Sequence, residues 1–474
     1  MKKSLFRNFL DIGLGTLISM IVGVITIPVI TRIVDPTQYG QLSIFNTYIS
    51  LILMVLMLGL DQSFVRFFYS GEGLAYKKEV LRKCWLPPFF LALIFSALVL
   101  AAELIFSVRF EFSLSVTAIL LVCVILEILN RFVLLNIRMQ YDTKLYAALS
   151  VAQKTLYMVL ALILILTWKG QDLLSLVLAT MISFLIPTAI GILMKKEYWF
   201  GETGSQVSYR GLIRYGMPFI LSMGLASLFQ ALDKLSINYF CDYAQVGIYT
   251  SAMQLANAFA IVQSTFNTMW APMAIEHYEK DPKDREFYVK GNQIITVVMF
   301  ALGILLILMK DVFAIFLGSK YREAAYVLPF LIFQPIMYTI SETTVGGINF
   351  MKKSSMHIWI AAGACLANFI GNTLLVPIYG SKGAAVSTGL SYILFWFLRT
   401  VIANRYYYVD YRMKKICAVI GFTVFYAWYS AFLSFGWITV LLAAADMLLL
   451  AVLYRDTFRT MLVWAKTKWQ NRKK

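Results

Sequence analysis

Charged side chains inside apolar segments are the residues of this sequence best placed to do chemistry. The stretch 231–250, ALDKLSINYFCDYAQVGIYT, places Asp233 and Lys234 side by side in an otherwise apolar run. A charge at the centre of a membrane helix costs roughly 2.5–3.5 kcal/mol on insertion scales, so it usually serves a function. Adjacent helical residues do not face each other, so we expect the two side chains to contact different partners.

The same segment carries a polar stripe. Ser227, Gln230, Lys234 and Asn238 follow one another at spacings of 3, 4 and 4, which puts them on one helix face, with Asp233 beside it. These residues are candidates for binding a polar or anionic substrate. Alternatively, Lys234 extends to the membrane interface and Asp233 binds a neighbouring helix.

A second pair of charges ends an earlier apolar run. The segment GLDQSFVRFF contains Asp61 and Arg66. Arg66 is a candidate substrate ligand, and Asp61 is a candidate for binding a coupling ion. Near the end of a span, however, a carboxylate and an interface-seeking arginine also have ordinary structural roles.

Three more charges occur in the next apolar runs. Glu127 and Arg131 stand at i and i+4 with the acid first, which favours a pair within one helix over a coupling role for Glu127. Lys154 has no acidic residue one turn away on its own helix. It is therefore a stronger candidate for binding substrate.

Glu342 lies in the middle of the apolar segment QPIMYTISETTVGGIN. A carboxylate at this depth is expected to change protonation or to bind a cation, so it is a candidate for ion coupling. The alternative is a neutral glutamic acid that joins two helices. Asp446 is also mid-span, whereas Glu103 and Arg399 lie near span ends and are expected to extend to the interface.

The composition identifies the elements that must position these residues. The chain of 474 residues is 60% hydrophobic and 14% charged, with a mean hydropathy of +0.73, whereas about a quarter of residues in soluble domains are charged. Runs of about 20 apolar residues are long enough to span a membrane. The sequence predicts an all-α integral membrane protein with about 14 spans, near 10–32, 42–69, 85–107, 113–136, 146–168, 172–194, 212–240, 247–274, 290–309, 324–350, 356–378, 383–404, 416–434 and 437–454.

Basic residues are distributed unevenly between the two sets of loops. Of the 42 lysines and arginines, thirty lie in the termini and every second loop, seven lie in the opposite loops and five lie inside spans. This asymmetry follows the positive-inside rule and predicts that both termini are cytoplasmic. The net charge of +17 therefore indicates anionic membrane lipids rather than nucleic acid as a partner, and the tail WAKTKWQNRKK is expected to meet the lipid surface.

Other classes of site find little support in the sequence. The first apolar run is too long for a signal peptide and lacks a cleavage site. The five cysteines show no paired spacing, and His277 and His357 lack metal-ligand spacing. We expect no disulfide framework, no metal site and no cofactor.

The chain contains an internal repeat. DPTQYGQLS (35–43) aligns with DYAQVGIYT (242–250) at an offset of 207, and the helices that follow share a polar face. In the second copy this face includes the candidate substrate ligands Gln254 and Asn257. We expect two six-helix lobes, 1–205 and 206–408, related by an axis along the membrane normal, and two extra helices with a basic tail in 409–474.

These motifs, in this order, resemble the polysaccharide transporter family, the Wzx-type flippases of lipid-linked oligosaccharides within the multidrug and oligosaccharidyl-lipid exporter superfamily. The stretches that carry the resemblance are TRIVDPTQYGQLSIF, LGLDQSFVRFF, LDKLSINYF, VGIYTSA and ANFIGNTLLVPIYGSKGAAVSTGLSYI. The resemblance covers nearly the whole chain.

The resemblance implies a flippase that moves an undecaprenyl-pyrophosphate-linked oligosaccharide across the bacterial cytoplasmic membrane for O-antigen, capsule or exopolysaccharide synthesis. It also implies alternating access driven by protons or sodium, and other polysaccharide-assembly proteins as partners. Arg66, Lys154 and Lys234 would then hold the pyrophosphate, while polar stripes would meet the sugars. No catalytic residue is implied.

Two other functions stay open. A drug or small-cation exporter of the same superfamily usually has twelve spans and an acidic cavity. An integral-membrane polymerase or ligase would have a large external loop, whereas the longest external loop expected here is KDVFAIFLGSKYRE.

Overall fold

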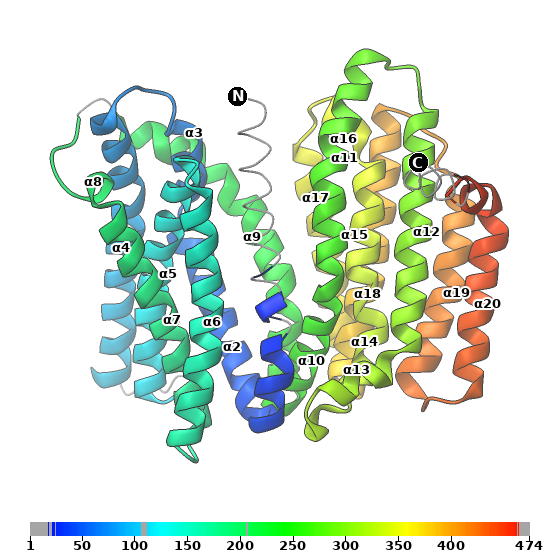
Figure 1. Cartoon of the computed structure of the whole chain (residues 1–474), viewed down its shortest axis with the longest axis horizontal. Coiled ribbons are helices and arrows are strands. Elements are labelled where there is room, and N and C mark those ends of the chain that lie inside the picture. The colour runs from blue at the N-terminus through cyan, green and yellow to red at the C-terminus, as the bar shows by residue number, and fades with distance from the viewer. Residues whose placement is uncertain are drawn as a thin grey trace, which may run out of the picture. The chain divides into compact units, whose positions relative to one another are not determined.

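The chain folds entirely into helices joined by turns and loops over the part that the structure describes (Figure 1). The computed structural model describes residues 18, 21–23, 25–105, 111–204, 207–461 and 463. About half of the predicted span 10–32, the basic residues before it and the tail WAKTKWQNRKK lie outside these residues. The all-α membrane fold expected from the composition is confirmed.

The number of spans stays partly a prediction. Among the described residues, eleven helices are long and apolar enough to cross a membrane, or twelve if 437–453 and 455–461, which meet at a bend of 85°, form one span. Two of the predicted fourteen are absent from this set. The first has only a shorter apolar helix, Ile21–Ile33, and the segment 247–274 is interrupted and carries many polar side chains.

Two compact units divide the chain between Lys234 and Leu235. Unit 1 contains a bundle of long helices (Figure 1) together with shorter ones. They are α2 (Pro36–Leu56), α3 (Leu60–Phe67), α4 (Leu74–Ile105), α5 (Leu114–Met139), α6 (Thr143–Thr167), α7 (Asp172–Met194), α8 (Lys196–Trp199) and most of α9 (Tyr209–Phe240).

Unit 2 begins within α9 and includes the last two helices. Its elements are α10 (Tyr243–Ala256), η1 (Asn257–Phe259), α11 (Ala260–Lys280), α12 (Glu286–Leu308), α13 (Lys310–Phe316), η2 (Ser319–Tyr321), α14 (Ala324–Leu331), α15 (Phe333–Thr344), α16 (Gly346–Phe350), α17 (Ser355–Tyr379), α18 (Ser381–Tyr406), α19 (Met413–Phe432) and α20 (Trp437–Leu453). The expected lobe boundaries at 205/206 and 408/409 stay predictions.

The aligned turns of the repeat have the same local role. Asp35 caps the N-terminus of α2 by accepting a hydrogen bond from the Thr37 N–H, and Asp242 caps α10 by accepting one from the Gln245 N–H. An aspartate in this position satisfies backbone donors that have no partner inside the helix. The turn therefore starts a helix in both halves.

The repeat continues into a helical hairpin in each unit. Gln245 Oε1 accepts hydrogen bonds from the Ser381 N–H at 3.2 Å and from its hydroxyl at 2.6 Å, at the tip between α17 and α18. In unit 1 the aligned Gln38 lines a pocket with Gly170 at the tip between α6 and α7. Both tips contain a positive-φ glycine, Gly170 (86°) and Gly380 (58°), a conformation that other residues rarely adopt.

The second span of each repeat is interrupted. In unit 1 the chain breaks between α2 and α3 at Gly59, which has φ +65° and packs against the backbone of Gly216 on α9. A Cβ at Gly59 would lie 2.1 Å from the Gly216 carbonyl oxygen, so only glycine fits there. In unit 2 the 3₁₀ turn η1 separates α10 from α11.

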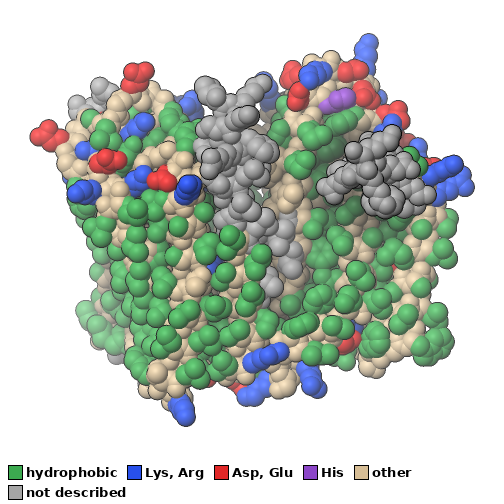
Figure 2. Space-filling model, viewed as in Figure 1, with side chains coloured by type: hydrophobic (Ala, Val, Ile, Leu, Met, Phe, Trp, Pro, Cys, Tyr) green, Lys and Arg blue, Asp and Glu red, His purple; other side chains and the backbone are tan. Residues whose placement is uncertain are grey.

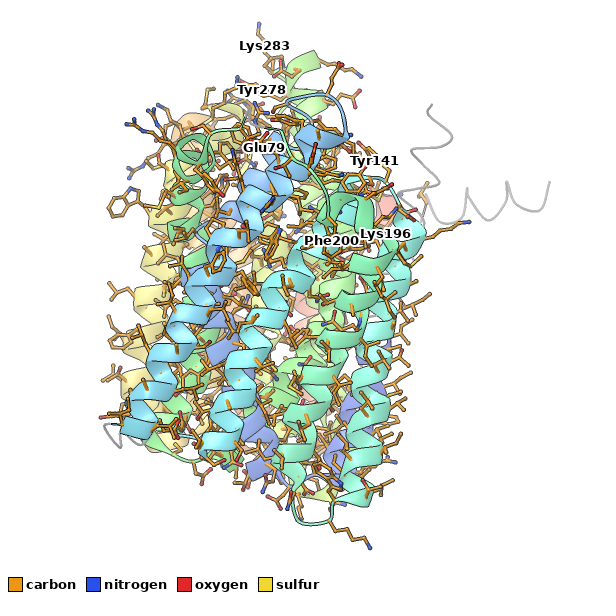
Figure 3. The ribbon with its side chains drawn as sticks, turned by 90° about the vertical axis from the view of Figure 1, so that its left-hand side faces the viewer. Glu79, Tyr141, Lys196, Phe200, Tyr278 and Lys283 are labelled. Atoms are coloured by element: carbon orange, nitrogen blue, oxygen red, sulfur yellow. The ribbon has the colours of Figure 1, made fainter. Side chains whose placement is uncertain are left out.

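A buried acid fixes the segment that leads into α9. Glu79 of α4 is 1% exposed, pairs with Lys83 at 2.6 Å and accepts a hydrogen bond from the Val207 N–H at 2.9 Å. Lys83 also donates to the Val207 carbonyl. Figure 3 shows Glu79 near the end of unit 1 that also bears Lys196 and Phe200.

The surface matches a membrane protein. Figure 2 shows, on the visible face of each unit, a broad belt of hydrophobic side chains, with charged side chains gathered beyond its edges. Many large apolar side chains are accordingly exposed, such as Leu98, Leu193 and Leu374, which are 63–68% exposed. Lipid replaces water as the solvent for such a belt.

Candidate functional site

The first charged cluster of unit 1 joins α3 to α5. Asp61 at the start of α3 is 2% exposed and accepts hydrogen bonds from Arg131 of α5, at 3.0 Å from Nε and 2.6 Å from Nη2. Its two oxygens also accept from the backbone and side chain of Gln62. Asp61 is therefore fully engaged, and its carboxylate holds Arg131 in place.

This geometry corrects the expected pair between Glu127 and Arg131. Arg131 bonds across to Asp61, because a helix N-terminus presents that carboxylate from α3, whereas Glu127 Oε2 is buried without a hydrogen-bond partner among the described residues. Arg131 and Lys154 are the charged neighbours of Glu127. Lys154 has no acidic residue on its own helix, but Glu127 of α5 is its acidic neighbour.

The cluster reaches the surface of unit 1 through its basic residues. Lys154 on α6 and Arg66 on α3 are exposed, and Arg66 lies 5.9 Å from the Phe67 ring centre. The side chain of Arg131 is 41% exposed. Asn130 donates to Gln153 at 3.2 Å, which ties α5 to α6 beside these charges.

The polar stripe of α9 has one buried and several accessible members. Asp233 is 2% exposed, Lys234 and Asn238 are partly buried, and Gln230 is exposed. Asp233 and Lys234 interact electrostatically. Gln254 near the end of α10 and Asn257 in η1 are exposed, so the break in this span presents amide groups at the surface of unit 2.

Glu342 of α15 is paired with an arginine. Arg399 of α18 donates from Nη1 to Glu342 Oε1 at 2.7 Å and to the Ser341 hydroxyl at 2.8 Å. Its guanidinium carbon lies 5.7 Å from the Tyr338 ring centre and 5.4 Å from that of Phe395. Cation–π contacts of this kind stabilise a desolvated guanidinium.

The expectation that Arg399 extends to the interface is therefore wrong. It is 6% exposed, because a carboxylate, a hydroxyl and two aromatic rings surround it. The sequence offered a neutral glutamic acid joining two helices as the alternative role of Glu342. The structure has instead an ion pair that joins α15 to α18.

The stretch that is most characteristic in the sequence has a structural role. Asn368 of α17 donates to Thr388 at 3.3 Å and accepts from Asn372 at 3.2 Å, while the Ser387 hydroxyl donates to the Asn368 carbonyl at 2.9 Å. All four side chains are buried. This network holds α17 against α18 and does not by itself indicate a binding site.

Sequence reasoning missed Arg131, Arg399 and Glu79 as organising residues. A local signal existed for each arginine: both were inside predicted spans, where an unpaired cation is costly. Their partners are 70 and 57 residues away, so spacing along the chain did not reveal them. No group of three or more metal-ligating side chains occurs among the residues that the structure describes.

Comparison with known proteins identifies the family of this chain. The family described as "Polysaccharide biosynthesis protein" matches residues 5–277. The chain belongs to this family, as the sequence motifs indicated.

Two curated relatives match part of the chain. An uncharacterized membrane protein of Methanocaldococcus jannaschii is 24% identical over 46% of this chain and 43% of its own length. The probable low-salt glycan biosynthesis flippase Agl15 of Haloferax volcanii is 20% identical over 44% of each. The chain thus spans less than half of the length of these relatives.

Solved structures share the fold over most of the chain. The lipid II flippase MurJ in an inward closed conformation has a TM-score of 0.69 at 14% identity and covers 94% of this chain and 99% of its own. Two structures of multidrug resistance transporters of the MATE family, at 16% identity, have TM-scores of 0.55 (inward-facing; 82% of this chain and 94% of its own) and 0.52 (outward-facing; 85% and 95%). At these identities the likeness defines the fold alone.

Proposed function

We propose that this protein is a flippase that moves an oligosaccharide linked to a lipid diphosphate across the membrane. The family match carries the proposal, and the fold shared with the lipid II flippase supports it. One relative is described as a probable flippase of glycan biosynthesis, which agrees with a polysaccharide biosynthesis family. In this proposal the carrier is undecaprenyl pyrophosphate and the polymer is an O-antigen, capsule or exopolysaccharide.

The diphosphate is the part of such a substrate that a membrane protein must bind most strongly. Two phosphates carry negative charge that needs cationic partners in a low-dielectric site. Arg66 and Lys154 are exposed and Arg131 is partly exposed, so unit 1 offers three cations to an anionic headgroup. Lys234, beside Asp233 on α9, is a fourth ligand in the proposed site.

Sugar hydroxyls need hydrogen-bond donors and acceptors rather than charge. The amides of Gln230, Asn238, Gln254 and Asn257 offer both. Three of these side chains are exposed, and Asn238 is partly buried. We propose that they contact the oligosaccharide.

The transport cycle we propose is alternating access. The fold has been seen inward closed in MurJ and both inward- and outward-facing in MATE transporters, so it supports more than one conformation. The interruptions at Gly59 and at η1 are natural hinges, because a break in a helix absorbs changes of backbone angle.

The driving force we propose is a proton or sodium gradient. Glu342, Asp61 and Glu127 remain the candidates for coupling. Glu127 is the freest of the three, since one of its buried oxygens has no hydrogen-bond partner among the described residues, whereas Asp61 and Glu342 each hold an arginine.

A drug exporter is the second candidate, because MATE transporters share the fold. The exposed cations of unit 1 disfavour it, since they would repel the cationic compounds that such an exporter with an acidic cavity moves. Polymerase or ligase activity has no support from the relatives and structures whose names state a function, which are a probable flippase, a flippase and transporters. We place the protein in the bacterial cytoplasmic membrane with both termini in the cytoplasm.

Deletion of the gene in its host tests the proposal. Lipid-linked repeat units should accumulate on the cytoplasmic leaflet and the surface glycan should disappear, and a plasmid copy should restore export. Normal glycan export in the deletion strain would refute a flippase function.

A further inference from the structure

The end of unit 2 that carries the tip between α17 and α18 holds two lysines against one aromatic ring. Lys310, the first residue of α13, has its Nζ 4.4 Å from the ring centre of Tyr326 on α14. Lys382, the second residue of α18, has its Nζ 4.7 Å from the same ring centre and 5.9 Å from that of Phe432 on α19. Cations within about 6 Å of a ring centre are attracted to its face. The ring of Tyr326 therefore gathers cations from two separate helices.

A carboxylate compensates only one of these two charges. Lys310 is fully buried and pairs with Asp311 at 2.9 Å. Lys382 is partly exposed and forms no ion pair within the described part of the chain. Two ammonium groups and one carboxylate leave a single uncompensated positive charge. Because the two cations repel each other most strongly in a medium of low dielectric constant, an anion at Lys382 would relieve that repulsion.

A row of aromatic side chains leads away from Lys382 along α19. Phe425, Trp428 and Phe432 follow one another at spacings of 3 and 4, so they share one face of the helix, and the buried residues of α19 lie on the opposite face. Neighbouring ring centres in the row are 6.5 and 6.0 Å apart. Phe425 and Trp428 are each 51% exposed. The row is therefore an exposed apolar surface about 10 Å long.

This surface lies where lipid is expected. The helix α19 is long and apolar enough to cross a membrane, so Phe432 marks one end of a span and Phe425 lies deeper. Tyr379, the last residue of α17, is 48% exposed, and its ring centre lies 5.3 Å from that of Phe432. A tyrosine at the end of a span is typical of the level of the lipid headgroups. Lys382 thus lies at headgroup level, and the aromatic row continues toward the middle of the bilayer.

The arrangement matches the two parts of a phospholipid. A phosphate needs a cationic hydrogen-bond donor, which Lys382 offers, and an acyl chain needs an apolar surface that runs into the membrane. A free phosphate ion would leave the aromatic row unused, and a lipid without net charge would leave the lysine charge uncompensated. A lysine that only extends to the interface would show no preference for one lipid over another.

We propose that Lys382 binds the phosphate of an anionic phospholipid whose acyl chain lies along Phe432, Trp428 and Phe425. Lys310 adds to the local positive potential without touching the lipid, because it is fully buried. The lipid covers the junction of α17, α18 and α19 at this end of unit 2. The site uses none of the residues proposed for substrate binding or ion coupling, so it stands or falls independently of the proposed flippase function.

Quenching of tryptophan fluorescence by brominated lipids tests the site. The purified full-length protein is placed in phosphatidylcholine liposomes that contain a small fraction of phosphatidylglycerol with dibrominated acyl chains. The signal of Trp428 is the quenching that disappears in Trp428→Phe. In the wild type, brominated phosphatidylglycerol should associate with the site about fivefold more tightly than brominated phosphatidylcholine, the effect of about 1 kcal/mol.

Variants and a competing anion locate this preference. Lys382→Gln should abolish it, because the cation is lost, and Lys382→Arg should keep it. Lys169→Gln is the matched control, since Lys169 is an exposed lysine at the corresponding tip between α6 and α7 of unit 1, and it should keep the wild-type preference. Excess inorganic phosphate, compared with chloride at equal ionic strength, should also leave the preference unchanged, because a free ion makes no contact with the aromatic row.

Four results would overturn the proposal. Equal quenching by the two brominated lipids in the wild type would do so whatever the variants show, and so would an unchanged preference in folded Lys382→Gln protein. A preference lost in Lys169→Gln would indicate a general attraction of anionic lipid to this basic protein. A preference lost in inorganic phosphate would assign Lys382 to a free anion instead. If Lys382→Gln does not fold, Lys382→Met takes its place.

Discussion

Each compact unit contains an arginine paired with a carboxylate on another helix, but the two pairs have different surroundings. In unit 1 the side chain of Asp61 is 3% exposed while that of Arg131 is 41% exposed. In unit 2 the values for Glu342 and Arg399 are 16% and 8%. The arginine is thus open in unit 1 and enclosed in unit 2.

The difference in neighbours follows the difference in exposure. Arg131 shares its region with Glu127 and Lys154, whereas Arg399 is covered by the rings of Tyr338 and Phe395. An open pair with an accessible lysine nearby is suited to binding an anion that arrives and leaves. An enclosed pair is suited to fixing α15 against α18, because its arginine is not open to an anion that binds and leaves.

Removing the enclosed arginine should have the largest effect on stability. Arg399→Met leaves Glu342 without its partner in a mostly buried site, so we expect a loss of about 3–5 kcal/mol in the free energy of unfolding. Denaturation of the detergent-solubilised protein measures it. Arg131→Met should cost less, because the stranded Asp61, although its side chain is only 3% exposed, keeps two hydrogen bonds from Gln62. An equal loss would contradict the distinction between open and enclosed pairs.

The double variant Arg399→Met, Glu342→Gln sharpens this prediction. Because it removes both charges, it should recover most of the stability lost in Arg399→Met. A double variant as unstable as the single one would show that the aromatic packing of Arg399, rather than its charge, dominates.

Removing the exposed Lys154 or the partly buried Lys234 should reduce transport. Lys154→Ala and Lys234→Ala should each lower the rate of lipid-linked oligosaccharide transport at least tenfold at normal membrane levels, because each removes a proposed phosphate ligand. Lys169→Ala, an exposed lysine in the turn between α6 and α7, is the matched control. Unchanged transport in both variants would assign the lysines to structure.

The variant Glu342→Gln should separate the role of this acid in ion coupling from its role in the stability of the protein. The amide of Glu342→Gln still accepts a hydrogen bond from Arg399, so it should destabilise the protein less than Arg399→Met does. Transport by this variant should lose its dependence on the ion gradient. Retained dependence would exclude Glu342 and leave Glu127 as the stronger candidate.

The smallest expected effect concerns a surface pair of unit 1. Asp142 caps α6 and lies 2.8 Å from Lys195. Burial alone would raise the pKa of Asp142, but the hydrogen bonds from Lys195 and the Leu145 N–H and the lysine charge lower it overall.

The sign of the pH effect follows from this lowered pKa. The stabilisation is present above the ordinary pKa of about 3.9 and is lost as the pH falls through the lower folded-state value. Melting curves should show a small acid-induced loss that Asp142→Asn abolishes. A loss of stability on raising the pH from 5 to 7 would contradict this prediction.

Much of the fold could be predicted from the sequence because its signals are local. Apolar length defines most spans, and an aspartate followed by a helix defines the two matching caps at Asp35 and Asp242. The segment 247–274 was harder, because its polar residues lower the hydropathy and η1 interrupts the helix. Helix breaks depend on packing, as the contact between Gly59 and Gly216 shows.

The sequence predicted single charged residues of the candidate site, but it did not predict which of them pair with each other. A charge within an apolar run marked Asp61, Glu127, Lys154 and Glu342, and this information is local. Which carboxylate takes which arginine depends on the folding of distant helices together. Spacing therefore favoured Glu127 for Arg131, and the position of Arg399 near a span end hid its partner.

Transport by purified protein in liposomes tests the central claim most directly. Liposomes with a lipid-diphosphate-linked oligosaccharide in one leaflet would be assayed for its appearance in the other. Wild-type protein should move this lipid but not the same glycan on an uncharged lipid, and Lys154→Ala should be at least tenfold slower. Equal movement of both lipids, or none of either by folded wild-type protein, would contradict the account.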